Sequence, residues 1–430
     1  MSLPLKALAE LLDETVEEVS DCTELSELER EELPAAVSHL LWNPDGQVPL
    51  LNSEVRHCVL ALACSKLFRD DGARPSCSRH AECQTLGESV PELFAVPYAP
   101  HKRASFTFID LFAGIGGFRI AFQDVGGRCV FSSEWDRFAK VTYMTNFGEL
   151  PYGDIRRIPK HQIPDHDVLC AGFPCQPFSL AGVSKKNSLG RQHGFLDETQ
   201  GTLFFEIKEI LRTKRPRAFM LENVKNILSH DRGRTFEVIR RSLQDELGYS
   251  VVWSVVDGSN WVPQRRERVF IVGFDPATVP LTDLEVKIPT SPHQGYRRPA
   301  LGEIIGEREV GYTIGEGTWQ TLLRHKAYHA ERGHGFGYGL HSLPIGKDEI
   351  TRTLSARYHK DGAEILIEQP GDRPRRLTVR EAMQLQGFDP ENFVIPVSNT
   401  QAYRQLGNSV VVPAIRDCAS MIARILCKPG

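Results

Sequence analysis

Hydrophobic positions between residues 106 and 274 follow two alternating patterns. Short apolar runs, each bounded by polar or glycine-rich residues, are typical of buried strands, and between them apolar residues recur at helical spacing. A helix is expected directly after the first strand. The pattern predicts strands at 106–112, 126–134, 166–173, 217–224, 249–261 and 268–274, and further helices at 136–147, 201–214 and 236–247. This alternation predicts an α/β fold with a doubly wound parallel sheet.

The segments on either side of this region have different patterns. Residues 1 to about 70 show helical apolar spacing, interrupted at Pro34, and predict an N-terminal helical extension followed by a linker. After Pro276 the alternation gives way to short segments broken by proline and glycine, which indicates a smaller, irregular domain. Helical periodicity returns from Val412 to Leu426 and predicts a last helix that packs on the sheet. We therefore expect boundaries at 1–103, 104–275, 276–398 and 399–430.

The composition is that of an ordinary globular protein. Of 430 residues, 41% are hydrophobic and 25% are charged, which suits two or three domains. The sequence shows no apolar run long enough for a membrane span and no secretory signal pattern, so we expect a cytoplasmic location with free thiols. Cys77, His80 and Cys83 lack the paired spacing of zinc ligands, so we predict no metal site.

Charge is unevenly distributed along the chain. The net charge of −4 argues against general coating of nucleic acid, and residues 1–40 are strongly acidic. Basic clusters occur later, at 212–217, 264–268, 296–298 and 373–376. Such runs are often only solvated surface. If the last three clusters line one cleft, they would instead hold a polyanion there while the acidic N-terminal residues face away.

The most distinctive chemistry lies in the octapeptide GFPCQPFS at 172–179. It follows a predicted strand, and Pro174 and Pro177 flank Cys175. Each proline fixes φ at about −65° and removes a backbone donor, so the segment continues neither a helix nor a central strand. Open α/β sheets place their ligands at such strand ends. A lone cysteine is usually inert packing, but this setting favours a nucleophile.

Successive strand ends carry candidates for binding a nucleoside cofactor. The glycine-rich turn within 108–118 lets backbone N–H groups approach a ligand, although it is not the GxGxxG of dinucleotide sites. Glu134 ends the second strand, where an acid can take ribose hydroxyls, and Trp135 can stack on an adenine. Asp154 could accept a hydrogen bond from the adenine amino group. Each residue also has a purely structural interpretation, as a cap, a surface aromatic or a turn residue.

Two further segments carry charged side chains. Glu222 follows four apolar residues, where its carboxylate is a candidate for acid chemistry or, alternatively, for capping a helix. The run QRRER begins a strand, and alternation predicts that Gln264, Arg266 and Arg268 share one face. On the face that holds Cys175, these arginines would grip a base carbonyl or a phosphate; otherwise the run is an unremarkable edge strand.

Several ordered motifs resemble one family. The chain is similar to the cytosine-C5 DNA methyltransferases from about residue 105 to its end, and within them to the Dcm and EcoRII type. The motifs are FIDLFAGIGGF (108–118), SSEWD (132–136), GDI (153–155), GFPCQPFS (172–179), ENV (222–224), QRRER (264–268), LTVREAMQLQGF (377–388) and QLGNSVVVP (405–413). The resemblance implies a Rossmann-like methyltransferase domain and a smaller, β-rich target-recognition domain.

The same resemblance implies S-adenosylmethionine as methyl donor. Because cytosine C5 is a poor nucleophile, the Cys175 thiolate would attack C6, while Glu222 binds N3 and the exocyclic amine and Arg268 holds O2. Since C6 is unreachable inside a duplex, the base would be flipped out. The catalytic set implied is Cys175, Glu222, Arg266 and Arg268. Cofactor residues are Phe112, Gly114, Gly116, Glu134, Trp135, Asp154, Ile155, Asn408 and Ser409, and substrate residues are Gln176, Ser179, Asn223, Thr353, Arg357 and Tyr358.

The resemblance also implies partners. We expect double-stranded DNA between the two domains, with Arg375 and Arg376 on its phosphates, and residues 276–376 selecting CCWGG first and CCNGG or CCGG next. The protein would be a bacterial, nucleoid-associated monomer, either an orphan or paired with a cognate restriction endonuclease. Three alternatives stay open: an RNA cytosine-C5 methyltransferase on the same scaffold, a catalytically idle DNA-binding regulator and, least favoured, a nicotinamide oxidoreductase.

Overall fold

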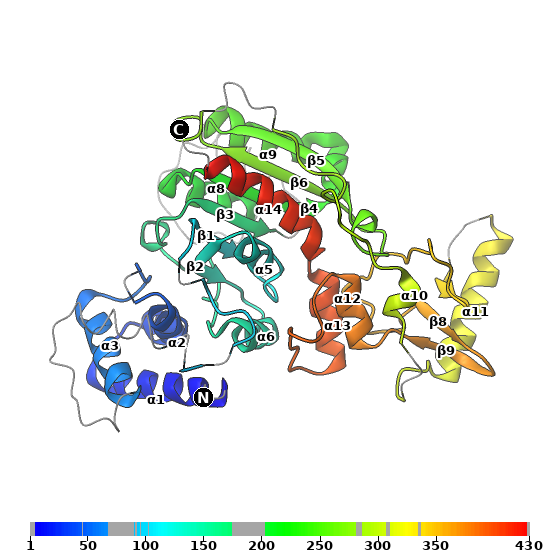
Figure 1. The fold of residues 1–430 in the computed structure, drawn as a ribbon, viewed down its shortest axis with the longest axis horizontal. Coiled ribbons are helices and arrows are strands. Elements are labelled where there is room, and N and C mark those ends of the chain that lie inside the picture. Colours follow the sequence, from blue (N-terminus) through cyan, green and yellow to red (C-terminus); the bar gives the residue numbers. More distant parts are fainter. Residues whose placement is uncertain are drawn as a thin grey trace, which may run out of the picture.

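A central sheet, an N-terminal group of helices and a smaller domain make up the protein (Figure 1). The computed structural model describes residues 5–44, 46–67, 90, 93–94, 96–101, 103–173, 203–280, 286–306, 310–333 and 337–427. Within these ranges, every helix is too short or too polar to cross a lipid bilayer.

The central sheet has six strands in the order β2-β1-β3-β4-β6-β5. They are β1 (Phe106–Leu111), β2 (Gly127–Ser133), β3 (Val168–Gly172), β4 (Ala218–Val224), β5 (Ser250–Asp257) and β6 (Glu267–Phe274). Strands β1 to β4 pair in parallel, but β6 runs antiparallel to both β4 and β5. The predicted doubly wound α/β fold is confirmed, but the sheet is mixed and not parallel throughout. Residues 258–266 are too few for the crossover of about a dozen residues that parallel neighbours need.

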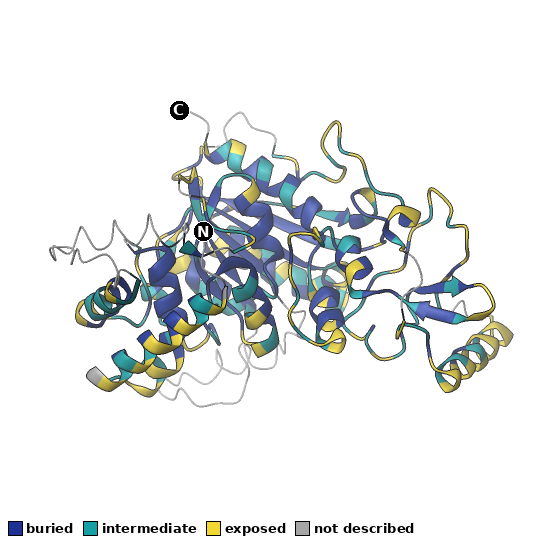
Figure 2. Ribbon diagram, turned by 60° about the horizontal axis from the view of Figure 1, so that its bottom comes forward, coloured by how far each residue is buried: buried dark blue, intermediate teal, exposed yellow. Residues whose placement is uncertain are grey.

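Helices cover both faces of this sheet. One face carries α5 (Gly117–Asp124), α6 (Arg137–Phe147) and α14 (Val412–Leu426), and the other carries α8 (Leu203–Lys214) and α9 (Arg234–Arg241). Strand alternation produces the two layers: Phe108 of β1 packs into the first apolar cluster and Ile109 into the second. The strands between them are buried (Figure 2). The predicted final helix is confirmed, and it lies beside α5.

Short helical turns complete the sheet domain. A π-helical turn extends α9, and Gly248 ends it, with φ 73° and its N–H donating to the Gln244 carbonyl. The turns are η1 (Lys160–Gln162), η2 (Lys225–Leu228), η3 (His230–Gly233), η4 (Ser242–Glu246) and η5 (Gly258–Asn260).

The smaller domain contains a three-stranded sheet in the order β7-β8-β9 and a long helix. Its elements are α10 (Leu301–Ile304), α11 (Glu316–Glu331), β7 (Leu340–His341), β8 (Leu366–Gln369) and β9 (Asp372–Arg376). Helices α12 (Val379–Leu385) and α13 (Asn399–Asn408) lie between it and the large sheet (Figure 1). The sequence pattern missed α11 because Leu322 is its one buried residue, so no apolar stripe marks it.

Three helices form the N-terminal module: α1 (Leu5–Cys22), α2 (Glu27–Trp42) and α3 (Ser53–Leu67). Pro34 was expected to interrupt the helical pattern, but it lies inside α2, which continues to Trp42. Helix α2 is buried on two sides. Leu40 packs against α1 and α3, whereas Ala35 belongs to the apolar cluster of the sheet domain. The module therefore shares core packing with the sheet domain.

A buried ion pair lies where this module meets the sheet domain. The Arg119 guanidinium of α5 donates to both oxygens of Glu149 at 2.7 and 2.9 Å, and neither side chain is exposed. His39 of α2 lies 3.6 Å from the same carboxylate. Burial opposes ionisation of Glu149, but the charge and hydrogen bonds of Arg119 outweigh it and lower the pKa of this carboxyl. Its charge is stable only while Arg119 is present.

We predict that Arg119→Met destabilises the protein by about 3–5 kcal/mol, because it leaves Glu149 buried without its partner. The pKa of Glu149 is lower in the folded protein than its ordinary value of 4.5. Its charge therefore stabilises the fold above that pH, and this stabilisation is lost as the pH falls through the folded-state pKa. The difference between parent and variant should therefore shrink in acid. Urea denaturation at several pH values measures it. Arg212→Met, which breaks the exposed pair with Glu209, is the control, and equal losses for both variants would contradict the prediction.

Candidate active site

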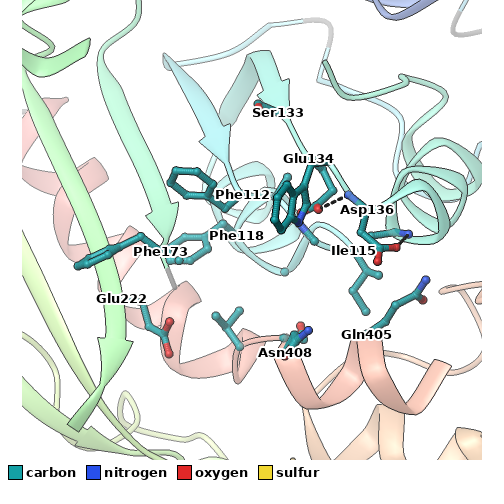
Figure 3. Close-up of a pocket in the computed structure, with 18 of the residues that line it drawn as sticks. Phe112, Ile115, Phe118, Ser133, Glu134, Asp136, Phe173, Glu222, Gln405 and Asn408 are labelled. Atoms are coloured by element: carbon teal, nitrogen blue, oxygen red, sulfur yellow. Dashed lines mark hydrogen bonds between the residues drawn. The ribbon is translucent and has the colours of Figure 1, made fainter. Parts of the chain in front are cut away.

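Loops from the carboxyl ends of β1, β2, β3 and β4 meet around one cavity of about 590 Å³ (Figure 3). The end of α13 closes it from the other side. Such strand ends are the usual ligand position in open α/β sheets, and the volume suits a nucleoside-sized molecule. Residues on its wall include Phe112, Glu134, Asp154, Phe173, Glu222 and Asn408.

The turn after β1 forms the floor of this cavity. Phe112, Gly114 and Gly116 have φ of 54°, 55° and 89°, a left-handed conformation that is costly for the phenylalanine. At Gly116 a Cβ would lie 2.2 Å from the Phe147 ring, so only glycine fits. These successive left-handed residues turn the backbone sharply between β1 and α5, as the glycine pattern predicted.

Glu134, at the end of β2, fixes this turn. Its carboxylate accepts from the Gly114 N–H at 2.7 Å and from the Asp136 N–H at 2.8 Å. Burial raises the pKa of Glu134, while these two backbone donors stabilise its charge. Trp135 lies next to it on the rim and is 71% exposed. The cavity thus has an acid on its wall and an indole at its mouth.

Asp154 and Ile155 line the neighbouring part of the wall. Partial burial disfavours the charge of Asp154, but hydrogen bonds from Arg156 lower the pKa of its carboxyl. The Arg156 Nε donates to both carboxylate oxygens, at 2.8 and 2.9 Å. Arg156 lines the cavity and was not predicted, because nothing in its spacing distinguishes it from a surface arginine. Asp154 is thus an ionised acceptor at the cavity edge.

The opposite wall contains Asn408 and Ser409, at the end of α13. Arg266 holds this end by donating to the carbonyls of Gly407 and Ser409 and to that of Leu354 at 3.1 Å. Burial lowers the pKa of Arg266 to about 9. Arg266 was expected to be catalytic and to contact the substrate, but its guanidinium is bound to backbone carbonyls. It is therefore a positioning residue.

Glu222 and Arg268 form the other end of the cavity. Glu222 ends β4 opposite Gly172 of β3, and the Arg268 Nε lies 2.9 Å from its carboxylate. Because β6 is antiparallel to β4, the start of β6 lies at the end of β4, with Arg268 opposite Val224. Asn223, predicted to bind substrate, instead donates to the Phe173 carbonyl at 2.9 Å and anchors the end of β3.

Several predicted DNA-facing residues lie elsewhere. Tyr358 is fully buried, with its hydroxyl bonded to Ile365 and Leu377, so its substrate-binding assignment was wrong. Arg375 is 2% exposed and pairs with Glu381, which excludes it as a phosphate contact. Both belong to the core of the smaller domain.

Gln264 is buried too, because its amide donates to the Leu385 carbonyl and accepts from the Leu354 N–H just before β6 begins. By contrast, Arg357 is exposed, and the Thr353 hydroxyl donates to the Arg265 carbonyl at 2.6 Å. Thr353 and Arg357 therefore stay available as predicted DNA-facing residues. Cys175, Gln176 and Ser179, like Cys77, His80 and Cys83, lie outside the described residues.

Comparison with known proteins identifies the family. The model of the C-5 cytosine-specific DNA methylases matches residues 106–424. The chain belongs to this family. A DNA-cytosine methyltransferase of Escherichia coli K12 is 44% identical over 389 residues, covering 77% of this chain and 80% of that protein. The type II methyltransferase M.NlaX of Neisseria lactamica is 49% identical over 328 residues, covering 75% and 97%. The enzyme is thus a DNA (cytosine-5-)-methyltransferase, and the nicotinamide alternative is excluded.

Solved structures agree with this fold. DNMT2 of Spodoptera frugiperda superposes with a TM-score of 0.56 at 19% identity, over 75% of this chain and all of that one. A putative DNA modification methyltransferase from an E. coli prophage gives a TM-score of 0.54 at 18% identity, over 75% and 100%. Members of the family use S-adenosylmethionine as methyl donor. The cavity fits this cofactor, since it offers an indole, two carboxylates and a glycine turn within about 590 Å³.

We predict that Trp135→Ala weakens S-adenosylmethionine binding about 3- to 10-fold, because a stacking surface worth about 0.5–1.5 kcal/mol is lost. Its high exposure means that the substitution leaves the fold intact. Calorimetric titration with the cofactor measures the change. Trp253→Ala removes a 43% exposed tryptophan on β5 and serves as the control. Equal affinities for the two variants would contradict the stacking role.

Proposed function

We propose that the enzyme methylates C5 of one cytosine, flipped out of duplex DNA, within a short palindrome that is CCWGG in the first instance. The observation that carries this proposal is the Glu222–Arg268 pair at the cavity end beside Gly172. An acid and a guanidinium side by side complement the edge of cytosine, which presents N3 and the exocyclic amine next to O2. Cys175 follows Gly172 by three residues in the sequence.

The chemistry requires a nucleophile, because cytosine C5 is unreactive on its own. In the proposed reaction the Cys175 thiolate adds to C6, and C5 becomes nucleophilic and takes the methyl group. Glu222 acts as the acid: it donates its proton to N3, where electron density rises as the thiolate adds, and accepts from the exocyclic amine, while Arg268 binds O2. Loss of the C5 proton and of the cysteine then restores the aromatic ring. The cofactor supplies only the methyl group.

The positions of Glu222 and Arg268 support base flipping. Glu222 and Arg268 line a cavity wall at the carboxyl edge of the sheet, and their exposed side-chain fractions are only 11% and 17%. A base stacked in a duplex could not bring C6 into such a recess. We propose that the target cytosine leaves the duplex and enters the cavity with its N3 edge towards Glu222.

DNA would lie where the smaller domain meets the sheet domain. Arg265 donates its backbone N–H to the Thr351 carbonyl at 2.9 Å, which joins the start of β6 to the segment 351–357. The side chains of Arg265 and Arg357 are both exposed. We propose that they contact phosphates in place of the buried Arg375, with Thr353 between them facing the DNA.

Accordingly, Arg265→Ala and Arg357→Ala should each weaken binding to cognate and non-cognate duplexes alike. Each phosphate contact contributes about −0.9 to the log–log salt slope, so each variant should have a slope shallower by about one unit. Duplex affinities between roughly 50 and 200 mM salt measure it. Arg212→Ala is the control, because this exposed arginine of α8 precedes the amino end of β4. Slopes equal to the control would refute the phosphate contacts.

The target sequence is tested in cells. DNA from cells expressing the enzyme should carry 5-methylcytosine at the inner cytosine of CCWGG, and base-resolution conversion sequencing locates it. Methylation found at CCNGG or CCGG instead would correct the proposed specificity. Cys175→Ser should lower the methylation rate by about 10³-fold or more while duplex binding persists. Parental methylation by the serine variant would refute the nucleophile, and activity on RNA in place of duplex DNA would refute the proposed substrate.

A further inference from the structure

Helix α2 lies along residues 148–153, which lead to Asp154 in the cavity wall. The Trp42 indole donates to the Gly148 carbonyl at 3.0 Å, and the Ser38 hydroxyl accepts from the Leu150 N–H at 2.9 Å. Further towards the start of α2, the Glu32 carboxylate accepts from the Gly153 N–H. Trp42 and Ser38, four residues apart, lie on one side of the helix, and Glu32 lies near its start, while the segment 148–153 runs in the opposite direction.

The contact of Glu32 is the most specific of these. The residue is 3% exposed, and its two oxygens lie 2.9 and 3.1 Å from the Gly153 nitrogen. At Gly153 a Cβ would lie 2.5 Å from Oε1, so the carboxylate occupies the space beside the backbone. A buried carboxylate costs desolvation energy, and an apolar residue would pack without that cost. Its placement therefore indicates a requirement for an acceptor at this N–H.

The Glu32 carboxylate fixes the peptide between Tyr152 and Gly153, one peptide before the bond that joins Gly153 to Asp154. The Gly153 N–H is held by Glu32, and the Gly153 carbonyl accepts from the Ser133 hydroxyl at 2.8 Å. Asp154 follows directly and lines the cavity. With both polar groups of Gly153 held, the backbone that leads into Asp154 is fixed by β2 and α2, while Arg156 binds the Asp154 carboxylate itself.

We propose that Glu32 is a positioning residue for S-adenosylmethionine, acting through Gly153 on Asp154, and that the N-terminal module is thereby part of the cofactor site. This inference rests on the proposed cofactor-binding role of Asp154. The region matched by the family model begins at residue 106, so α2 lies outside it. The module therefore supports cofactor binding through residues of this chain that lie beyond the matched domain.

The test compares Glu32→Ala, Glu32→Asp and Glu32→Gln in the full-length enzyme. Loss of a hydrogen bond to a charged acceptor should raise Kd and KM for S-adenosylmethionine about 10-fold in Glu32→Ala. The kcat at saturating cofactor and the KM for DNA should stay within about twofold of the parent. Glu32→Asp withdraws the carboxylate by one methylene and should also raise Kd, whereas Glu32→Gln keeps an acceptor at the same reach and should bind nearly as the parent does.

Two further variants distinguish a failure of the Glu32 positioning role from a failure of the Asp154 assignment. Glu31→Ala removes an exposed neighbour that pairs with Arg157 and should leave cofactor affinity unchanged. Asp154→Ala tests the underlying assignment, and parental Kd there would refute the role of Asp154 itself. If Asp154→Ala weakens binding while Glu32→Ala and Glu32→Asp bind as the parent does, the positioning role is overturned. If Glu32→Ala does not fold, Glu32→Asp decides: raised Kd supports the role, and unchanged Kd overturns it.

Discussion

The antiparallel pairing of β4 with β6 is the constraint on which the active site depends. It places the start of one strand at the end of the other, with Val224 opposite Arg268, and so brings a guanidinium to the Glu222 carboxylate. In a wholly parallel sheet the start of β6 would lie at the opposite edge, a strand length away. The short connection between β5 and β6 enforces this reversal. Backbone topology, more than local sequence, therefore creates the acid–guanidinium pair.

The cofactor end of the cavity depends on buried polar contacts. Glu134 holds the turn after β1 through the Gly114 N–H, and Arg266 holds the end of α13 through backbone carbonyls. From outside the matched domain, Glu32 and His39 reach the segment 148–153 and the pair of Arg119 and Glu149. Buried charges without partners would be costly, so these networks favour one arrangement of the loops. The cavity is preorganised in this sense.

Sequence patterns predicted the elements that have strong local signals. The spacing of apolar residues predicted the strands and the final helix, and the conformational freedom of glycine predicted the turn after β1. The positions of acidic residues after successive strands predicted that these acids converge. Features decided by tertiary contacts were missed. Arg375 looks like any basic-cluster residue until Glu381 is seen beside it, and Tyr358 becomes a core residue only after folding. Pro34 was no helix stop, because α2 is packed on both sides and tolerates a missing N–H.

The proposed mechanism requires a covalent bond between Cys175 and the target base. Incubation with S-adenosylmethionine and a duplex containing 5-fluorocytosine at the target should trap this adduct, because fluorine at C5 cannot leave as a proton does. Mass spectrometry of the digested complex then identifies the attached peptide. One adduct is expected, located at Cys175 and dependent on the cofactor. An adduct on another residue, or efficient methylation of cytosine with no adduct formed on the fluorinated duplex, would contradict it.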